Sequence, residues 1–385
     1  MMLEATTAIP YGNACDVSIA ENARMTTVEF APDPHGGPEV MWFCLRVRRG
    51  PGGRRVPRNL KLVLRNAGNM LGAGKARNIH PVLRGAGGDW TRMEAGKPRT
   101  LPDGRMNVSW RLRVPDQSVD IALCYPYGQD EVESLVSQTG EFYESHKIGA
   151  SQEARPIVRL SNTSGSKRDR RAGLYLLARQ HSGETPGSWV LDGFLRHIAA
   201  ERRKEPLVWA VPLADIDGVE KGDYGKDNFP YDLNRAWGSP PMRHEVLVLQ
   251  RDIARWRERC RPVLAIDFHA PGLCEQDGMY AFLPKPESSA EAFDKATVWA
   301  QLLSRELGKE FSAGEFARIA TYASRWETPG FSVFCASLGV CALSIETPYA
   351  ISADGGLLTR DRYREAGARL ALGVLKQLQT SRSNR

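Results

Sequence analysis

Short runs of alternating apolar and polar residues fill the first third of the chain. Such runs, separated by glycine, proline and aspartate, predict half-buried strands, because successive side chains of a strand point to opposite faces. The clearest are MTTVEFAP (25–32), VMWFCLRVR (40–48), LKLVLRN (60–66) and MNVSWRLRV (106–114). No helical pattern lies between these runs. The pattern therefore favours an antiparallel β-sandwich.

From about residue 130 the chain alternates between strands and longer amphipathic segments. This alternation predicts an α/β sheet covered by helices, because continuous apolar runs suit central strands that are buried on both faces. The apolar runs include 173–179, 207–212, 263–268, 278–284 and 340–346. Apolar positions recur every three to four residues, as in helices, over 187–203, 243–259, 290–307 and 360–379.

Length and composition indicate a globular protein of two domains. A chain of 385 residues, with 42% hydrophobic and 25% charged residues, matches neither a disordered nor a membrane protein. The net charge of +7 comes largely from basic clusters at 46–58 and 164–171, which we interpret as solvated turns; a contact surface for nucleic acid or an acidic protein tail is the alternative. No nucleic-acid motif or interleaved aromatic residue accompanies them, so no nucleic-acid partner is expected.

The first twenty residues, the length of the apolar runs and the cysteines favour a cytoplasmic location. The first twenty residues contain neither the basic start nor the apolar run of a secretory signal, and no run reaches the ~18 apolar residues of a membrane span. The seven cysteines are scattered without a CxxC pair, as expected of reduced thiols. We therefore expect no membrane partner.

His181 and Glu184 stand three residues apart in ARQHSGET (178–185), where a predicted strand ends. Such a strand-to-helix turn lies at the carboxyl edge of an α/β sheet, where side chains from several loops converge. Imidazole nitrogens and carboxylate oxygens both bind Zn²⁺. The HxxE spacing alone is a weak indication, since it also occurs in ordinary surface pairs.

His269 follows the buried strand VLAIDF (263–268) and should reach the same edge of the sheet. With His181 and Glu184 it forms a His₂Glu set, the ligand set of hydrolytic zinc sites that keep one position for water. Asp267 would point to the same side and orient the imidazole of His269 through a hydrogen bond. The alternative for a histidine at this place is a core or capping role. Together the residues predict a site for one zinc ion.

Two further motifs carry polar groups. DLNRAW (232–237) places Asn234 beside Arg235, and an arginine can grip a carboxylate through two hydrogen bonds; an ordinary turn is the alternative. In ALSIETPY (342–349), Glu346 ends an apolar strand. Burying an unpaired carboxylate is costly, so a cleft beside a metal-bound water explains Glu346 better than a core position does.

Five short motifs follow one another in a fixed order: HSGE, DG (217–218), DLNR, DFHA and SIETP. Through these motifs the chain resembles the M14 family of zinc carboxypeptidases over roughly residues 130–380. It is most similar to the cytosolic carboxypeptidases, in which a β-sandwich precedes the peptidase domain. The run VMWFCLRVR and the junction CYPYGQDEVESL (124–135) fit that arrangement. The resemblance implies an N-terminal β-sandwich domain over 1–128 and a carboxypeptidase-type α/β domain with a mixed central sheet over 129–385.

The resemblance also implies a role for each residue. Asn234 and Arg235 would hold the terminal carboxylate of a peptide or protein tail. Glu346 would act as general base, taking a proton from zinc-bound water and passing it to the leaving amine. Relatives trim glutamates from acidic tails, but members of the wider family cut other peptides, so the sequence leaves the preferred residue open.

The sequence departs from the family pattern near DLNR. Where relatives carry an arginine in a GNYR-like stretch, this chain reads GDYGKDNFPY (222–231), with Gly225 in place of the arginine and Lys226 beside it. Lys226 would then serve as a point charge without the bidentate fork. DIDG (215–218) replaces the customary NPDG. Spacing alone suggests Tyr322 as the tyrosine that closes over substrate in many relatives; a structural aromatic is the alternative.

Two other functions stay open at this level. One is a zinc amidohydrolase of the aspartoacylase and succinylglutamate desuccinylase type, which uses the same metal ligands on N-acyl amino acids. The predicted N-terminal β-domain argues against it. The other is an inactive peptidase-like protein that binds partners through its sandwich. The complete set of predicted ligands and Glu346 argues against inactivity, whereas the missing arginine argues for it.

Overall fold

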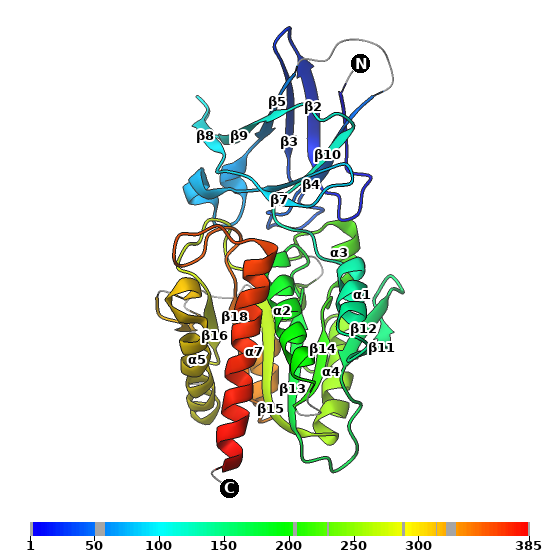
Figure 1. Ribbon diagram of the computed structural model, residues 1–385, viewed down its shortest axis with the longest axis vertical. Helices are drawn as coiled ribbons and strands as arrows, with labels where there is room; N and C mark the ends of the chain where they lie inside the picture. Colours follow the sequence, from blue (N-terminus) through cyan, green and yellow to red (C-terminus); the bar gives the residue numbers. More distant parts are fainter. Residues whose placement is uncertain are drawn as a thin grey trace.

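A computed structural model of the chain describes residues 3–50, 58–202, 206–228, 231–286, 289–312, 314–320 and 329–383. Its strands form three sheets. Two five-stranded sheets, A and B, come from the first 122 residues, and an eight-stranded sheet C lies among the helices at the other end of the molecule (Figure 1). No helix in these ranges is both long enough and apolar enough to cross a membrane.

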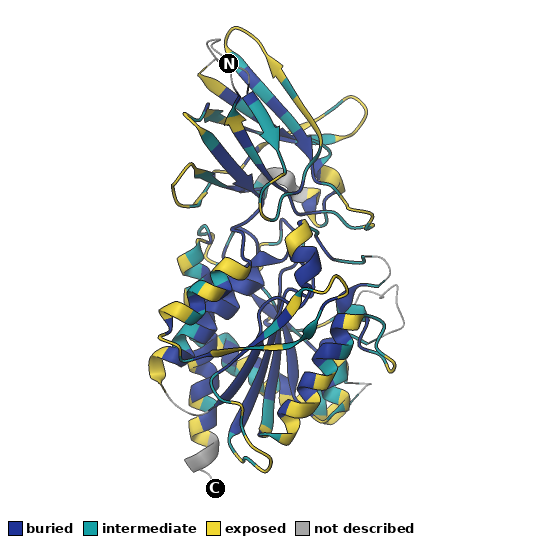
Figure 2. Ribbon diagram, turned by 90° about the vertical axis from the view of Figure 1, so that its right-hand side faces the viewer, coloured by how far each residue is buried: buried dark blue, intermediate teal, exposed yellow. Residues whose placement is uncertain are grey.

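Sheets A and B pack against each other as the sequence predicts. In spatial order, sheet A consists of β1 (Leu3–Thr6), β4 (Cys44–Arg49), β10 (Ser118–Ala122), β6 (Val82–Gly85) and β7 (Thr91–Arg92). Sheet B consists of β2 (Cys15–Glu21), β3 (Met25–Ala31), β5 (Asn59–Leu64), β9 (Met106–Arg113) and β8 (Lys97–Thr100). Inward residues such as Phe30 and Leu62 are fully buried, whereas most outer positions are half-buried or exposed (Figure 2).

Two details of these sheets differ from the prediction. β3 and β5 pair in parallel, although all other neighbours in sheets A and B are antiparallel. β4 begins only at Cys44, whereas the apolar run predicts a strand from residue 40. The residues before it, Met41 to Phe43, are buried without being a strand, because their side chains pack into the core.

Sheet C is mixed, as the sequence predicts. Its spatial order is β11 (Glu144–Ala150), β12 (Pro156–Ser161), β14 (Leu207–Val211), β13 (Ala172–Ala178), β15 (Arg261–His269), β18 (Ala342–Glu346), β16 (Tyr280–Leu283) and β17 (Ala317–Ile319). The four central strands, β14, β13, β15 and β18, are parallel, so their carboxyl ends meet at one edge. β11, β12 and β17 carry no strong apolar pattern and were not predicted as strands.

Helices cover both faces of sheet C. α2 (Thr185–Glu201), α5 (Ala290–Phe311) and α7 (Arg360–Ser383) lie on one face, where Phe194 of α2 contacts Phe268 of β15. α4 (His244–Glu258) and α6 (Phe331–Ser337) lie on the other, where Trp256 and Phe331 contact Tyr175 of β13. The remaining helices are α1 (Gln129–Gln138), α3 (Ile216–Lys221) and the short 3-10 turns η1 (Ala67–Asn69), η2 (Ala73–Asn78) and η3 (Leu233–Arg235).

α2 begins at Thr185, a little earlier than the amphipathic pattern predicts. Pro186 is tolerated there because the first turn of a helix has no internal partner for its backbone N–H. All seven cysteines are free thiols, as expected. The division of the chain into domains at residues 128 and 129 stays our proposal, and α1 begins at Gln129.

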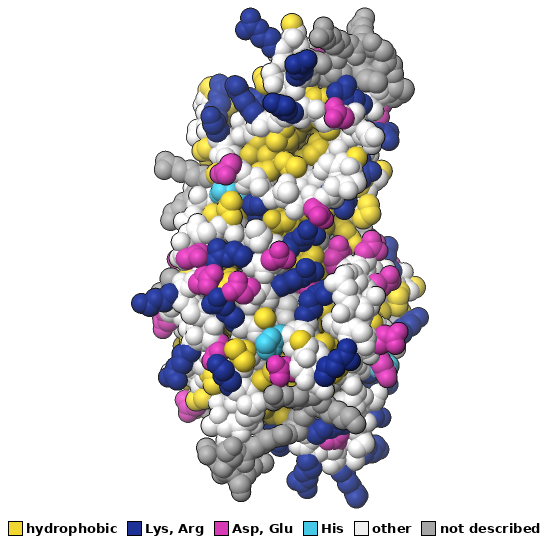
Figure 3. All heavy atoms as spheres, in the orientation of Figure 1, with side chains coloured by type: hydrophobic (Ala, Val, Ile, Leu, Met, Phe, Trp, Pro, Cys, Tyr) yellow, Lys and Arg dark blue, Asp and Glu magenta, His cyan; other side chains and the backbone are white. Residues whose placement is uncertain are grey.

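The sheets from the first third of the chain lie over the carboxyl edge of sheet C. A Cβ atom on Gly183 would lie 3.1 Å from Trp42, and one on Gly72 would lie 2.6 Å from the backbone of Gly272. His35 also contacts Asp223, with 2.5 Å between Nδ1 and Oδ1. Lysine and arginine side chains gather at the far end of these sheets (Figure 3).

Candidate metal centre and active site

The three predicted metal ligands come from two neighbouring parallel strands. β13 ends at Ala178, and the turn that follows carries His181 and Glu184 before α2 begins. β15 ends at His269 itself. Because the two strands pair in parallel, both ends lie at the same edge of sheet C.

The ligand atoms of these residues converge on one point. His181 Nδ1 lies 2.9 Å from Glu184 Oε1, and His269 Nδ1 lies 2.7 Å from Glu184 Oε2. One ligand atom of each residue lies within 4.8 Å of the others, and all three side chains are buried. Within the described ranges, this is the one such cluster of His, Cys, Asp or Glu. The structure thus brings together the three residues that the sequence nominated separately.

A second carboxylate stands behind each imidazole. Asp267 Oδ2 lies 2.5 Å from His269 Nε2, the contact expected from its place in the strand. Both oxygens of Asp232 lie 3.1 Å from His181 Nε2. Carboxylates in this position fix the ring and make its other nitrogen a better ligand. Sequence reasoning missed Asp232, although it is the first residue of DLNR.

The position of Asp267 is fixed in turn by buried amide and indole groups. Gln180 Nε2 donates to Asp267 Oδ2, and Trp237 Nε1 donates to Gln180 Oε1 over 2.7 Å. Asp232 and Trp237 both belong to DLNRAW (232–237), so this segment supports both histidines through two different side chains.

The charge balance of the cluster suits a cation. Burial lowers the pKa of His181, but the carboxylates of Asp232 and Glu184 outweigh that effect and raise the pKa to about 9. Burial also lowers the pKa of His269, but the carboxylates of Asp267 and Glu184 outweigh it and raise the pKa well above its ordinary value. Protonated rings thus neutralise the buried carboxylates. A divalent ion would supply that positive charge among the same atoms, so these residues fit a metal site.

A cavity of about 290 Å³ opens beside this cluster. The predicted residues that line it are His181, Glu184, Lys226, Asn234, Arg235, His269 and Glu346. Tyr322 lies outside the described residues. Seven of the eight predicted site residues therefore share one pocket.

Glu346 is held at the pocket without a partner for one of its oxygens. Its Oε2 is buried, and no residue in the described ranges offers it a hydrogen bond. Burial raises the pKa of Glu346 to about 7; Glu184 acts in the same direction, while His269 and Lys226 oppose it. A carboxylate with this pKa can exchange protons near neutral pH, which a general base requires.

Asn234 and Arg235 lie on η3 at the pocket wall. Asn234 Nδ2 lies 3.1 Å from His269 Nε2, and its Oδ1 accepts from the backbone N–H of Phe331 over 3.0 Å. Arg235 Nη1 donates to the carbonyl of Asn234 over 2.9 Å. These contacts fix the amide and the guanidinium close to the candidate metal ligands.

Gly225 occupies a place that no side chain fits. Its φ is +86°, and a Cβ there would lie 2.5 Å from the backbone nitrogen of Ser182, inside HSGE. An arginine at this position would therefore clash with the loop that carries His181. Lys226, the next residue, reaches the pocket instead.

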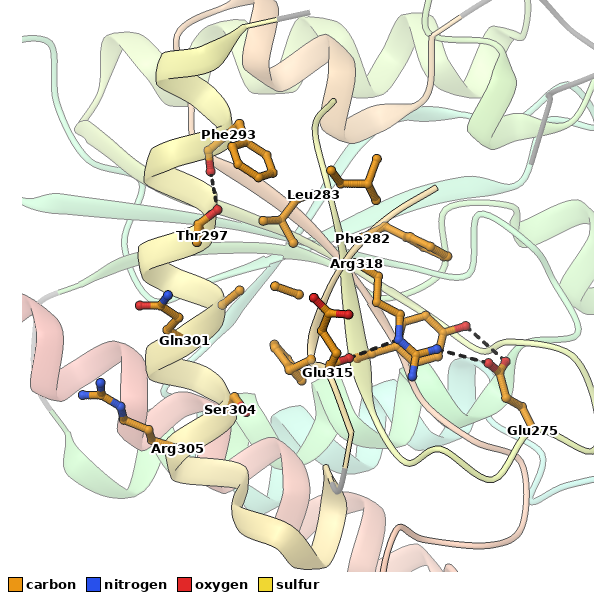
Figure 4. A pocket seen from close by; sticks show the side chains of 15 residues that line it. Glu275, Phe282, Leu283, Phe293, Thr297, Gln301, Ser304, Arg305, Glu315 and Arg318 are labelled. Carbon is orange, nitrogen blue, oxygen red and sulfur yellow. Dashed lines mark hydrogen bonds and ion pairs between the residues drawn. The ribbon is translucent and has the colours of Figure 1, made fainter. Parts of the chain in front are cut away.

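A second, larger cavity of about 890 Å³ lies beside the candidate pocket, between α5 and the strands β16 and β17. Phe282 and Leu283 line both cavities. Figure 4 shows Arg318 beside Glu275 in this cavity; its guanidinium lies 3.8 Å from the ring centre of Tyr280. None of the predicted site residues lines this cavity, so the candidate chemistry belongs to the smaller one.

No protein-family model matches the chain. In sequence it is similar to cytosolic carboxypeptidase 6 of Mus musculus, with 28% identity over 232 residues that cover 55% of this chain and 42% of that protein. The Homo sapiens protein of the same name is 28% identical over 244 residues, or 58% of this chain and 48% of its own. The chain spans about half the length of these curated relatives.

Solved structures resemble it over nearly its whole length. A metallo-carboxypeptidase from Burkholderia cenocepacia has a TM-score of 0.76 and 17% identity, covering 99% of this chain and 100% of that one. One from Pseudomonas aeruginosa, in complex with (2-guanidinoethylmercapto)succinic acid, has a TM-score of 0.69 and 20% identity, covering 97% and 99%. At such identities the likeness concerns the fold. The chain is therefore a sequence relative of the cytosolic carboxypeptidases and has the metallo-carboxypeptidase fold.

Proposed function

We propose that this protein is a zinc metallocarboxypeptidase that removes C-terminal residues from peptides or protein tails. The observation that carries the proposal is the buried set of His181, Glu184 and His269 beside Glu346 in one pocket. The names of the sequence relatives support the same activity.

Zinc is the metal that we propose for this site. Two imidazoles and one carboxylate are the ligands of hydrolytic zinc in several peptidases, and the pocket beside them leaves room for water. Bound Zn²⁺ lowers the pKa of its water toward ~7 and polarises the substrate carbonyl.

In the proposed mechanism, Glu346 removes the proton from the attacking water and later donates it to the leaving amine. Its unpaired Oε2 and its pKa of about 7 support both steps, because one carboxyl group must accept and release a proton at neutral pH. Asp232 and Asp267 hold the imidazoles in place through their Nε2 atoms while this happens.

Asn234 and Arg235 would bind the terminal carboxylate of the substrate, and Lys226 would stabilise the oxyanion that forms on the scissile carbonyl. The three side chains line the pocket that holds Glu346. The backbone at Gly225 leaves no room for an arginine side chain. Lys226 offers a compact positive charge instead, without the two parallel hydrogen bonds of a guanidinium. Acidic terminal residues such as glutamate would suit the cations Lys226, Arg235 and Lys285 at this pocket. We propose a cytoplasmic location, as in the relatives' names.

The decisive experiment measures zinc content and then the release of amino acids from peptides that differ in their last residue. N-acetyl and N-succinyl amino acids are assayed in parallel. The proposal predicts release from peptides with a free carboxyl end, none from the same peptides ending in an amide, and loss of turnover in Glu346→Gln. That variant should keep its metal, because Glu346 is not among the three ligands.

Other outcomes would replace the proposal. Turnover of acylated amino acids alone would indicate an amidohydrolase of the aspartoacylase type. Bound zinc without turnover of either substrate class would indicate a binding protein that has lost its activity.

A further inference from the structure

The outer face of sheet B carries a row of basic side chains that the proposed peptidase chemistry does not use. The basic face, as we define it, consists of Lys61, Arg65, Lys97, Arg99, Arg111 and Arg113. These residues come from β5, β8 and β9 or directly follow them, and their inward neighbours Leu60, Leu62 and Trp110 are buried in the core. Lysine and arginine side chains gather at this end of the molecule (Figure 3).

Strand register shows that the basic side chains are neighbours. Lys61 lies directly opposite Arg111 on the adjacent antiparallel strand, and Lys97 lies opposite Ser109, two residues before Arg111. Directly opposed side chains of a sheet have Cβ atoms only ~5 Å apart, and like charges at that distance repel. A pair of this kind is therefore unfavourable for the folded protein alone and becomes favourable when an anion neutralises it.

Few acidic side chains of the described residues neutralise the basic face. None of its six residues forms an ion pair within the described ranges; nearby, Arg105 is paired with Asp103. Of the described residues that line the hollow over this face, Glu29 is the one acidic residue, among Lys61, Arg65, Arg99 and Arg105. The hollow has a volume of about 460 Å³. A concave surface with this imbalance attracts polyanions.

We infer that the basic face is a docking surface for an acidic, extended segment of a partner protein. Carboxylates on one side of an extended chain repeat every ~6.8 Å, which is also the repeat of alternate residues within a strand. Lys97 and Arg99, and likewise Arg111 and Arg113, have that spacing. None of the described residues that line the hollow is aromatic, so they offer bases no stacking platform. The inference is independent of the proposed peptidase activity.

The test uses a fluorescent ten-residue glutamate peptide that is acetylated at one end and amidated at the other. The blocked carboxyl end keeps it from being held as a substrate by Asn234 and Arg235. Binding is followed by fluorescence anisotropy at low and physiological salt. We expect binding that weakens with salt, because exposed charges are screened, and equal binding by Glu346→Gln.

Two double variants change the net charge equally. Lys61→Glu with Arg99→Glu alters the basic face, whereas Lys167→Glu with Arg170→Glu alters exposed residues of the other basic cluster, outside this face. The first should weaken binding by roughly tenfold or more, and the second should leave it unchanged. Lys61→Glu also places a negative charge directly opposite Arg111, so the melting temperature should not fall. Should the first variant fail to fold, Lys61→Gln with Arg99→Gln repeats the comparison.

Three results would overturn the inference. Equal loss in both double variants would mean that only bulk charge matters. Tighter binding of a single-stranded or duplex oligonucleotide of equal charge would identify a nucleic-acid surface instead. Absence of peptide binding by the unaltered protein at low salt would exclude a docking role.

Discussion

Glu346 lies directly opposite His269 in the register of the parallel strands β18 and β15. Register partners on adjacent strands project to the same face of a sheet, so the carboxylate of Glu346 and the imidazole of the candidate ligand His269 share one side of sheet C. His181 and Glu184 reach that point from the next strand, β13. The geometry of the candidate site therefore follows from the order of three parallel strands.

Lys226 should set the lower pH limit of activity. A general base works in its ionised form, so activity should be present above the pKa of Glu346 and should fall as the pH drops through it. Lys226 lowers that pKa, which burial otherwise raises. In Lys226→Met the acid limb of the kcat/KM profile should shift to higher pH, whereas Lys226→Arg should keep it in place. An unmoved limb in Lys226→Met would contradict this role.

Metal binding should compete with protons on His181. The folded pKa of His181 is about 9, above the ordinary 6.5. The proton therefore contributes stability to the metal-free protein that is fully present below pH 6.5 and is lost as the pH rises through 9. Over the same window the apparent zinc affinity should increase, since the ion must displace the proton.

Thermal unfolding of the metal-free protein between pH 6 and 9.5, paired with zinc titration against a competing chelator, checks both trends. Stability of the metal-free protein that rises steadily from pH 6.5 to 9 would rule out this assignment.

The site was more predictable from sequence than the fold around it. His181, Glu184, His269 and Glu346 follow continuous apolar strands, so their meeting at one edge follows from parallel pairing. Asp232 was missed because it caps a short 3-10 turn from outside any helix or strand, where no periodic pattern tells which way a side chain points. β11 and β17 were missed for a related reason: they are the edge strands of sheet C, where weak apolar patterns suffice, and β12, the neighbour of β11, was missed with them.

Gly225→Ala should disturb the metal site. A Cβ there meets Ser182, so the alanine must push the HSGE loop away and weaken metal binding. Gly87→Ala is the matched control, because Gly87 also has a positive φ, +70°, but has nothing within 4 Å of the added atom. Both variants should lose about 1–2 kcal/mol of unfolding free energy from backbone strain. Only Gly225→Ala should lose zinc affinity, and equal affinities in the two would refute the packing argument.

Arg159 of β12 and Asp252 of α4 form a buried ion pair between sheet C and that helix. Arg159 Nη1 lies 2.7 Å from Asp252 Oδ1, and the guanidinium stacks on Trp209 at 3.5 Å. Arg159→Leu should cost about 3–5 kcal/mol, because it leaves a buried carboxylate without its cation. Urea unfolding of Arg159→Leu and of Arg159→Leu with Asp252→Asn measures this. The double variant should be the more stable of the two; a less stable one would show that packing, not charge, dominates.

The most direct test of the whole account is the zinc content of the purified protein and its single variants after zinc loading and removal of excess ion. The account predicts about one zinc per chain in the unaltered protein and in Glu346→Gln, and almost none in His181→Ala or His269→Ala. Retention of a full equivalent by both histidine variants, or no zinc in the unaltered protein, would contradict it.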